Sequence, residues 1–223
     1  MSKALIISLA IVTAILSCFL AFESTLFDRS FFKSEFKNLG IYEREGDFLP
    51  DNMSETVLLF YENKIPELNL SYLTPSETSH MVDVKNIVRS AINLKRILVV
   101  LWLILMVLLA FKGGKNVLKD IGKVYRAAGI AALLIVALLG VGALFFSPFF
   151  SLFHKVFFPQ GNYLFPYDST LLLIFTFQLQ FNFFKTTIIK VLLSGCVMFL
   201  IGKFIIHFSE KKVKTRPARA GRH

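Results

Sequence analysis

Long runs of residues without a charged side chain dominate this sequence. Residues 4–22 and 127–153 contain no Asp, Glu, Lys or Arg. Both runs exceed the roughly 18 apolar residues that mark a candidate membrane-spanning helix. Over the whole chain of 223 residues, 55% of the side chains are hydrophobic and the mean hydropathy is +0.62. This composition argues against a soluble enzyme and predicts a polytopic membrane protein.

The charged residues are divided unevenly along the chain, and this division predicts the topology. Residues 23–96 hold 12 of the 15 acidic residues and 9 of the 25 basic ones, so this segment is net negative. The other basic residues concentrate in the segment 112–126 and in the tail after residue 210. The positive-inside rule places both basic segments in the cytoplasm and the acidic segment outside. We attribute the net charge of +10 to topology and not to nucleic-acid binding.

Hydropathy and charge together predict four transmembrane helices with both termini in the cytoplasm. The expected spans are residues 4–22, 92–111, 127–147 and 186–208. The segment before the second span is long and mixed in polarity, and three prolines interrupt it, which predicts a small folded cap. The expected fold class is an all-α membrane protein with an extracellular cap of mixed short helices and strands.

The chain divides accordingly into five parts. These are a first transmembrane helix (1–22), the extracellular cap (23–91), transmembrane helices two and three with a basic cytoplasmic loop (92–147), a second extracellular segment at the interface (148–185), and a fourth transmembrane helix with a basic cytoplasmic tail (186–223). The first run imitates a secretory signal, but it continues past Cys18 to Phe22, so we expect it to be retained. Cys18 and Cys196 are expected at unequal depths in their spans, so we do not expect a disulfide between them.

Local signals within the cap predict where one of its helices begins. Thr74, Pro75 and Glu77 supply an N-cap, a proline at the first helical position and a glutamate three residues after the cap. In the helix that follows, His80 and Asp83 share a face with apolar residues. Earlier in the cap, residues 54–61 are expected to be helical and residues 69–73 extended.

The second extracellular segment is unusually aromatic. Nearly half of residues 149–167 are Phe, Tyr or His. Such rings collect at the membrane–water interface, so an interfacial belt is the default interpretation. A turn is expected at residues 159–162, and residues 171–184 are expected along the membrane surface.

The positions of the four histidines indicate where chemistry is possible. His207 and His223 are expected on the cytoplasmic side, about 30 Å of hydrocarbon away from the cap. His80 and His154 are expected outside, close to the membrane surface. A single histidine there is more often a solvated or structural ring, but two at one cleft supply a base and an acid near neutral pH. A metal site built from His80, Asp83 and His154 is the weaker alternative, because the spacing of these residues is not diagnostic.

Two stretches of sequence carry a resemblance to a known family. Residues 80–85 read His-Met-Val-Asp-Val-Lys before the second span, and residues 153–163 read Phe-His-Lys-Val-Phe-Phe-Pro-Gln-Gly-Asn-Tyr after the third. With the four spans, the cap and the length, they resemble the bacterial lipoprotein intramolecular transacylase family over nearly the whole chain. The resemblance implies an integral membrane enzyme with His80 and His154 as its catalytic residues.

The resemblance also implies a reaction. Such an enzyme moves the sn-2 acyl chain of a lipoprotein's diacylglyceryl-cysteine onto the α-amino group of the same cysteine, which gives the lyso-form lipoprotein. One histidine would act as base and the other as acid or oxyanion donor. The residues expected to orient these groups or to position the substrate are Asp83, Lys85, Phe157, Phe158, Asn162 and Tyr163. The expected partners are diacylglyceryl-modified lipoproteins and the lipid bilayer, and neither a cofactor nor a metal is expected.

The competing interpretation is a non-enzymatic polytopic membrane protein whose cap binds a partner. Four spans without an inverted repeat, and without ionisable residues in mid-span, argue against a transporter. Mass analysis of a lipoprotein N-terminus in cells with and without this chain would separate a partner-binding protein from a transacylase.

Overall fold

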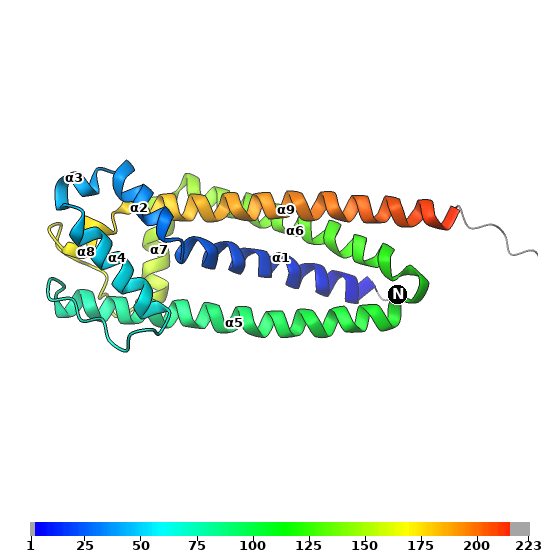
Figure 1. The fold of residues 1–223 in the computed structure, drawn as a ribbon, viewed down its shortest axis with the longest axis horizontal. Coiled ribbons are helices and arrows are strands. Elements are labelled where there is room, and N and C mark those ends of the chain that lie inside the picture. The colour runs from blue at the N-terminus through cyan, green and yellow to red at the C-terminus, as the bar shows by residue number, and fades with distance from the viewer. Residues whose placement is uncertain (1–2, 215–223) are drawn as a thin grey trace, which may run out of the picture. The chain divides into compact units, whose positions relative to one another are not determined.

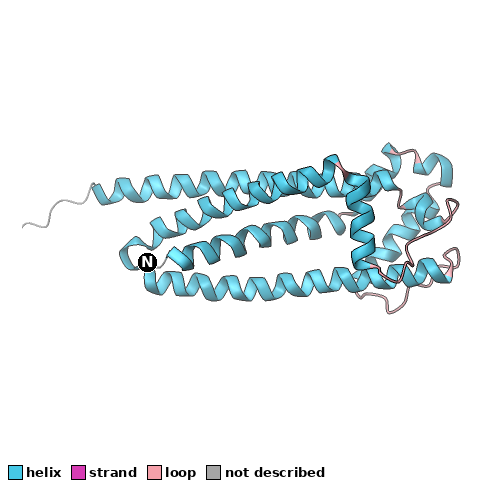
Figure 2. Cartoon of the chain, turned by 180° about the vertical axis from the view of Figure 1, so that it is seen from behind, coloured by secondary structure: helices cyan, strands magenta, loops and turns pink. Residues whose placement is uncertain are grey.

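A computed structural model describes residues 3–214, without the side chains of residue 115 and residues 212–214. The predicted basic tail after residue 214 and His223 lie outside the described residues. Within the described part of the chain, every regular element is a helix (Figures 1 and 2). The all-α class is therefore confirmed, and the strands expected in the cap are wrong.

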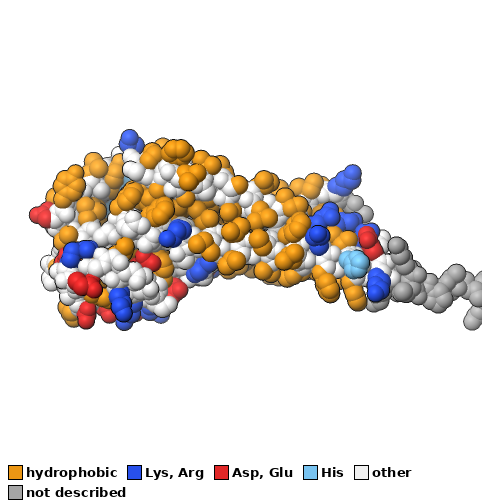
Figure 3. Space-filling view, turned by 90° about the horizontal axis from the view of Figure 1, so that it is seen from above, with side chains coloured by type: hydrophobic (Ala, Val, Ile, Leu, Met, Phe, Trp, Pro, Cys, Tyr) orange, Lys and Arg blue, Asp and Glu red, His pale blue; other side chains and the backbone are white. Residues whose placement is uncertain are grey.

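Four helices are long and apolar enough to cross a membrane. They are α1 (Lys3–Leu26), α5 (Pro75–Gly113), α6 (Val117–Leu144) and α9 (Phe177–Lys214). Hydrophobic side chains cover much of the surface of these helices in Figure 3, as is usual where lipid is the solvent. The protein is an integral membrane protein, and the four apolar helices predicted from the sequence are confirmed.

The remaining helices are short. They are α2 (Arg29–Asn38), α3 (Ile41–Glu45), α4 (Phe48–Tyr61), the 3₁₀ helix η1 (Gly114–Asn116), α7 (Phe146–Phe157) and α8 (Thr170–Ile174). The helix expected at residues 54–61 is present as the second half of α4. The last long helix begins at Phe177 and not at residue 186, because polar residues at its start lower the hydropathy without interrupting the helix.

The chain forms two compact units, which we describe separately. The first unit comprises the described residues of the segments 1–18, 95–137 and 190–223, and the second comprises Phe19–Leu94 and Leu138–Ile189. Each of the four long helices contributes residues to both units.

In the first unit, glycines allow α6 and α9 to approach closely. Gly122 and Gly129 are two turns apart on α6, and Gly195 and Gly202 have the same spacing on α9. A Cβ on Gly129 would lie 2.6 Å from the backbone nitrogen of Phe199 and 2.7 Å from the Gly195 carbonyl oxygen. Small residues of this kind let transmembrane helices pack backbone against backbone. Cys18 and Cys196 are free thiols, as expected.

We expect Gly129→Ala to destabilise the protein by about 1–3 kcal/mol, because the added methyl group meets the α9 backbone, which cannot move aside as a side chain can. Thermal unfolding of the purified protein in detergent measures the effect. Gly140→Ala on the same helix is the matched control, since no atom lies within 4 Å of its added Cβ. Equal midpoints for the two variants would contradict the close packing.

The second unit holds the larger hydrophobic core. Its fully buried side chains include Phe36 of α2, Ile41 of α3, and Met53 and Leu58 of α4. The apolar residues in this region recur at spacings of three and four, which is the helical period and not the period of two that a half-buried strand requires. The segment 69–73, expected to be extended, contains a turn and no strand: the Leu73 N–H donates to the Leu70 carbonyl at 3.0 Å.

Helix α5 begins where the sequence predicts. The backbone N–H of Thr74 donates to Glu77 Oε2 at 2.7 Å, and the Glu77 N–H donates to Thr74 Oγ1 at 3.3 Å. This reciprocal pair is a capping box, and it fixes the first turn of α5. The position of His80 within the second unit follows from this start.

Candidate active site

His80 lies in the second turn of α5 and is surrounded by aromatic rings. Its residue is only 6% exposed. The ring centroid of Phe158 is 4.5 Å from that of His80, and the Phe165 centroid is 5.5 Å away in an edge-to-face arrangement. Nδ1 of His80 is buried and has no hydrogen-bond partner among the described residues. An unpartnered nitrogen in a buried ring is unusual and marks a position that a ligand can satisfy.

His154 lies in the last turn of α7, and its tautomer follows from one hydrogen bond. Nδ1 is 2.9 Å from the backbone carbonyl oxygen of Phe150, one turn earlier in the same helix. A carbonyl oxygen only accepts hydrogen bonds, so Nδ1 carries the proton. In the neutral ring, Nε2 then keeps its lone pair and is the nitrogen available to a substrate.

The two histidines, which are distant in the sequence, are stacked in the structure. Their ring centroids are 6.1 Å apart and their planes differ by 21°. Phe158 is 2% exposed and lies against both rings, with its centroid 5.4 Å from that of His154. Tyr163 also packs on His154, with 5.1 Å between the two ring centroids. The site is therefore a pair of imidazoles within an aromatic enclosure.

Asp83 connects α5 to the loop that follows α7. Its Oδ2 accepts hydrogen bonds from Asn162 Nδ2 at 2.6 Å and from Gln160 Nε2 at 2.8 Å. Gly161 between these residues has φ +78°, a left-handed conformation that lets both amides turn toward the same carboxylate. Asp83 therefore anchors this loop; the role expected for it from the sequence was to orient the catalytic histidines.

Burial keeps both imidazoles neutral at physiological pH. The pKa of His80 is lowered to about 4, mainly by burial and also by the charge of His154, while a hydrogen bond with Asn162 and the charge of Asp83 oppose the shift. Burial also lowers the pKa of His154, against the hydrogen bond to Phe150. Two neutral imidazoles side by side can accept one proton between them, and their mutual repulsion disfavours a second.

Comparison with known proteins decides the family. The family described as "Lipoprotein intramolecular transacylase Lit" matches residues 5–184 of this chain. The chain belongs to the Lit family. Because this is a family of lipoprotein transacylases, the chain is a transacylase and therefore an acyltransferase.

Solved structures share the fold of this Lit family member. The membrane integral lipoprotein intramolecular transacylase Lit from Bacillus cereus is 17% identical, with a TM-score of 0.81 over 95% of this chain and 98% of that chain. Two variants of the same protein, in which one histidine is replaced by arginine or by alanine, give TM-scores of 0.75 and 0.74. The arginine variant is 17% identical, and the match covers 96% of this chain and 94% of that chain. The alanine variant is 16% identical, and the match covers 95% of this chain and 96% of that chain. A search of curated proteins finds no match.

Two of the residues predicted for the Lit substrate site lie away from the histidines. Phe157 is 49% exposed and contacts the ring of Phe153. Lys85 lines a separate pocket together with Phe60 and Arg89, and neither histidine is part of that lining. Asp83, Phe158, Asn162 and Tyr163 are grouped around the histidine pair. Among residues 3–214, no group of three His, Cys, Asp or Glu side chains is arranged to hold a metal ion.

Three contacts of the candidate site were not predicted from the sequence. Phe150 supplies the carbonyl that binds His154, and its ring centroid lies 4.1 Å from the histidine ring. Its position four residues before His154 is the signal that could have identified it. Phe165 and Gln160 carry no such signal, because their contacts depend on the path of the loop.

Glu77 holds the far end of the same loop. Its Oε1 accepts from the Leu171 N–H at 2.9 Å and from Ser169 Oγ at 2.5 Å, while Oε2 binds Thr74. Burial would raise the pKa of Glu77, but these hydrogen bonds outweigh it and hold the pKa below its usual value. The charged carboxylate is thus the stable form, and it attaches the segment after the loop to the start of α5.

Proposed function

We propose that this protein moves the sn-2 acyl chain of a lipoprotein's diacylglyceryl-cysteine onto the α-amino group of the same cysteine. The observation that carries the proposal is the pair of neutral, stacked imidazoles of His80 and His154 in a member of the Lit family. The Bacillus cereus relatives with a replaced histidine add support, because a histidine was the residue changed in that transacylase.

The proposed reaction needs one proton to move from nitrogen to oxygen. The free amine attacks the ester carbonyl carbon, the C–N bond forms, and the bond from that carbon to the glyceryl oxygen breaks. The amine attacks as the free base, which is partly populated near neutral pH because an α-amine has a pKa of about 7.7–8.0. After the attack the nitrogen must lose a proton. A neutral imidazole accepts this proton, and the same proton is returned to the leaving glyceryl oxygen. The reaction therefore needs no second reactant: one proton passes from the amine to the histidine pair and then to the glyceryl oxygen.

The arrangement of the two rings supports this single-proton role. His154 presents Nε2 as an acceptor, because its Nδ1–H is committed to Phe150. His80 lies beside it with a buried, unpartnered Nδ1. Repulsion between two imidazolium ions disfavours double protonation, so a proton accepted by the pair is readily given up to a more basic oxygen.

The aromatic enclosure supports the geometric part of the proposed catalysis. Attack within one lipid-modified cysteine closes a medium-sized ring through nitrogen, sulfur and the glyceryl carbons, which is conformationally costly in a free lipid. Phe158 and Tyr163 beside His154 provide surfaces that would confine the folded substrate. Holding reacting groups in position in this way removes entropy cost from the chemical step.

We further propose that the site faces the extracellular side of the bacterial cell membrane and that both termini are cytoplasmic. The net negative segment 23–96, which carries His80, and the basic segment 112–126 support this orientation. The diacylglyceryl-cysteine of an exported lipoprotein would then reach the site from outside the cell.

A label-mixing experiment tests whether transfer stays within one molecule. Two lipoproteins of different peptide mass, one with isotopically heavy acyl chains and one with light chains, are incubated together with the purified protein in detergent. We expect each lyso-form product to keep its own label, because the enzyme never holds a free acyl group. Mass spectrometry of the N-terminal lipopeptides reads the result.

Heavy amide-linked chains on the light lipoprotein, at a rate near the total, would contradict the intramolecular path. Acyl chains arriving from added phospholipid would contradict it equally. The control is the His154→Ala variant, which should give neither product and so reports any uncatalysed exchange. An unchanged diacylglyceryl-cysteine with the wild-type protein would instead favour a non-enzymatic, partner-binding role.

A further inference from the structure

Helix α7 has two sides of different character. Ser147, Ser151 and Lys155 recur at every fourth residue and are all exposed, so they form one polar stripe along the helix. Apart from these three residues and His154, every side chain of α7 is apolar. The helix is therefore amphipathic, and its apolar side needs a cover that keeps water away.

Helix α9 covers one part of this apolar side. The ring centroid of Phe146 lies 5.2 Å from that of Phe177 and 5.1 Å from that of Phe181. The Phe150 centroid lies 5.4 Å from that of Phe177. These ring contacts bury Phe146 and account for its row of the helix as packing within the protein.

The other part of the apolar side is exposed. Leu152 and Val156, one turn apart, are 60% and 62% exposed, and Phe145, two turns before Leu152, is 62% exposed. Phe153 and Phe157 are exposed beside them, with 4.6 Å between their ring centroids. We call these five residues the α7 patch. Contiguous apolar side chains of this kind on a surface indicate contact with another apolar partner.

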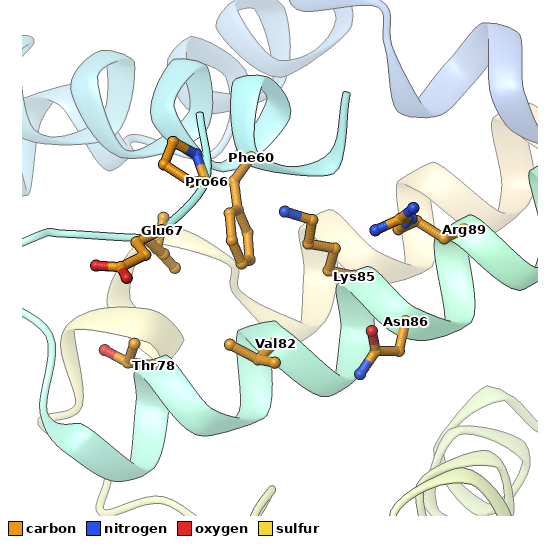
Figure 4. Close-up of a pocket in the computed structure, with 9 residues that line it drawn as sticks. Phe60, Pro66, Glu67, Thr78, Val82, Lys85, Asn86 and Arg89 are labelled. Carbon is orange, nitrogen blue, oxygen red and sulfur yellow. The ribbon is translucent and has the colours of Figure 1, made fainter. Parts of the chain in front are cut away.

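Apolar exposure is not general in the second unit. The side of α5 that faces the pocket in Figure 4 carries Thr78, Lys85, Asn86 and Arg89 from successive turns, with Val82 as the one apolar residue among them. Such a side is usual for a helix in contact with water. The α7 patch therefore has a surrounding of its own that differs from that of α5 in this unit.

The neighbouring helix indicates what covers the α7 patch. Helix α6 ends at Leu144, and only Phe145 separates it from α7. The last two turns of α6 expose Leu138, Val141 and Leu144. Because α6 is one of the four apolar helices of an integral membrane protein, lipid acyl chains surround such side chains. Its apolar surface continues through Phe145 into the α7 patch, so the same lipid covers both.

The direction of the polar stripe agrees with this cover. Phe149 is two residues from both Ser147 and Ser151, so at about 100° per residue it lies on the opposite side of α7. Its ring faces α6 and α9: a Cβ on Gly142 would lie 3.3 Å from it, and the Phe184 centroid is 5.1 Å away. The stripe therefore points away from these two helices. Figures 1 and 2 both show α7 running across the direction of α9.

We propose that α7 lies along the surface of the bilayer and that acyl chains of membrane lipid cover the α7 patch. Ser147, Ser151 and Lys155 face the headgroups and water, as the polar side of an interfacial helix does. This contact does not depend on the acyl-transfer reaction. It also holds His154, which belongs to the same helix, close to the membrane surface.

Spin labelling of the full chain in vesicles of phosphatidylcholine and phosphatidylglycerol tests the proposal. Cys18 and Cys196 are replaced by alanine, and a nitroxide is attached through Ser151→Cys or Val156→Cys, two exposed positions on different sides of α7. Power saturation in electron paramagnetic resonance measures collisions with oxygen, which dissolves in lipid, and with a nickel chelate, which stays in water. We expect the ratio of oxygen to chelate collisions to be several-fold higher at Val156→Cys than at Ser151→Cys.

Two exposed positions provide the references. Leu134→Cys in α6 should give the ratio of a label in lipid, and Lys37→Cys in α2 that of a label in water. Val156→Cys should resemble the first and Ser151→Cys the second. If Val156→Cys lowers the thermal unfolding midpoint, Leu152→Cys is a second variant on the same side of the helix.

Three results would overturn the proposal. Ratios like that of Lys37→Cys at both α7 positions would place the helix in water. Ratios like that of Leu134→Cys at both would place it inside the bilayer instead of along its surface. Exclusion of both reagents from Val156→Cys, with spectral broadening by a second label, would show that another copy of the chain covers the α7 patch.

Discussion

Replacing His80 by alanine is expected to reduce the rate of lyso-form lipoprotein synthesis by about a hundredfold or more, and replacing His154 should have the same effect. Each substitution removes one half of the pair that carries the transferred proton. The loss should be in the catalytic rate, since neither ring anchors an acyl chain. Conversion of diacylglyceryl-cysteine to the amide-linked product, followed by mass spectrometry with purified protein, is the measurement.

The design must separate loss of chemistry from loss of fold. His80 is buried, so His80→Gln is a second variant that keeps a polar side chain of similar size where alanine would leave a cavity. His207→Ala on α9 is the control, because His207 belongs to the other compact unit and should be dispensable. Full activity in either His80→Ala or His154→Ala, at normal expression and thermal stability, would require a different site.

Asp83→Ala should lower the rate about a hundredfold through misplacement of the loop, although Asp83 does not itself touch the reacting atoms in the proposed mechanism. The substitution releases the amides of Gln160 and Asn162 together. Asp83→Asn keeps an oxygen that accepts both hydrogen bonds, so this variant should recover most of the rate. Steady-state rates of the three proteins test this ordering.

A purely electrostatic role for Asp83 gives the opposite ordering. If its charge on His80 were what matters, asparagine would be as damaging as alanine. Asp168→Ala is the matched control, because Asp168 is an exposed carboxylate between α7 and α8 that makes no hydrogen bond to the amides of Gln160 and Asn162. A rate for Asp168→Ala as low as that of Asp83→Ala would show that net charge in this region, and not the loop anchor, controls activity.

Interactions between residues close in the sequence made parts of this fold predictable. The capping box at Thr74 and Glu77 is a short-range signal, so the start of α5 and the turn that carries His80 follow from residues within one helical turn. Apolar runs likewise predicted the four long helices. Residues 69–73 were misread because a short alternating pattern is ambiguous when a turn can satisfy the same backbone groups.

The site itself was readable only in part. Asp83 and Asn162 are 79 residues apart, and no periodicity connects them. Lys85, in contrast, could have been excluded from the histidine site, because five residues at 3.6 per turn place it about 140° around the helix from His80. The expected positions of the four histidines, and then the family resemblance, indicated His80 and His154 as a pair, while their stacking and the tautomer of His154 required three-dimensional positions.

The two carboxylates of α5 at positions 77 and 83 bracket His80 by three residues on either side. Each one holds a different end of the chain between residues 160 and 171: Asp83 binds Gln160 and Asn162, and Glu77 binds Ser169 and Leu171. Both ends of this stretch are therefore attached to the helix that carries His80. Local opening of this region should involve the loop and the first turns of α5 as one cooperative unit of hydrogen exchange, and acidification through the lowered pKa of Glu77 would weaken the attachment at Ser169 and Leu171.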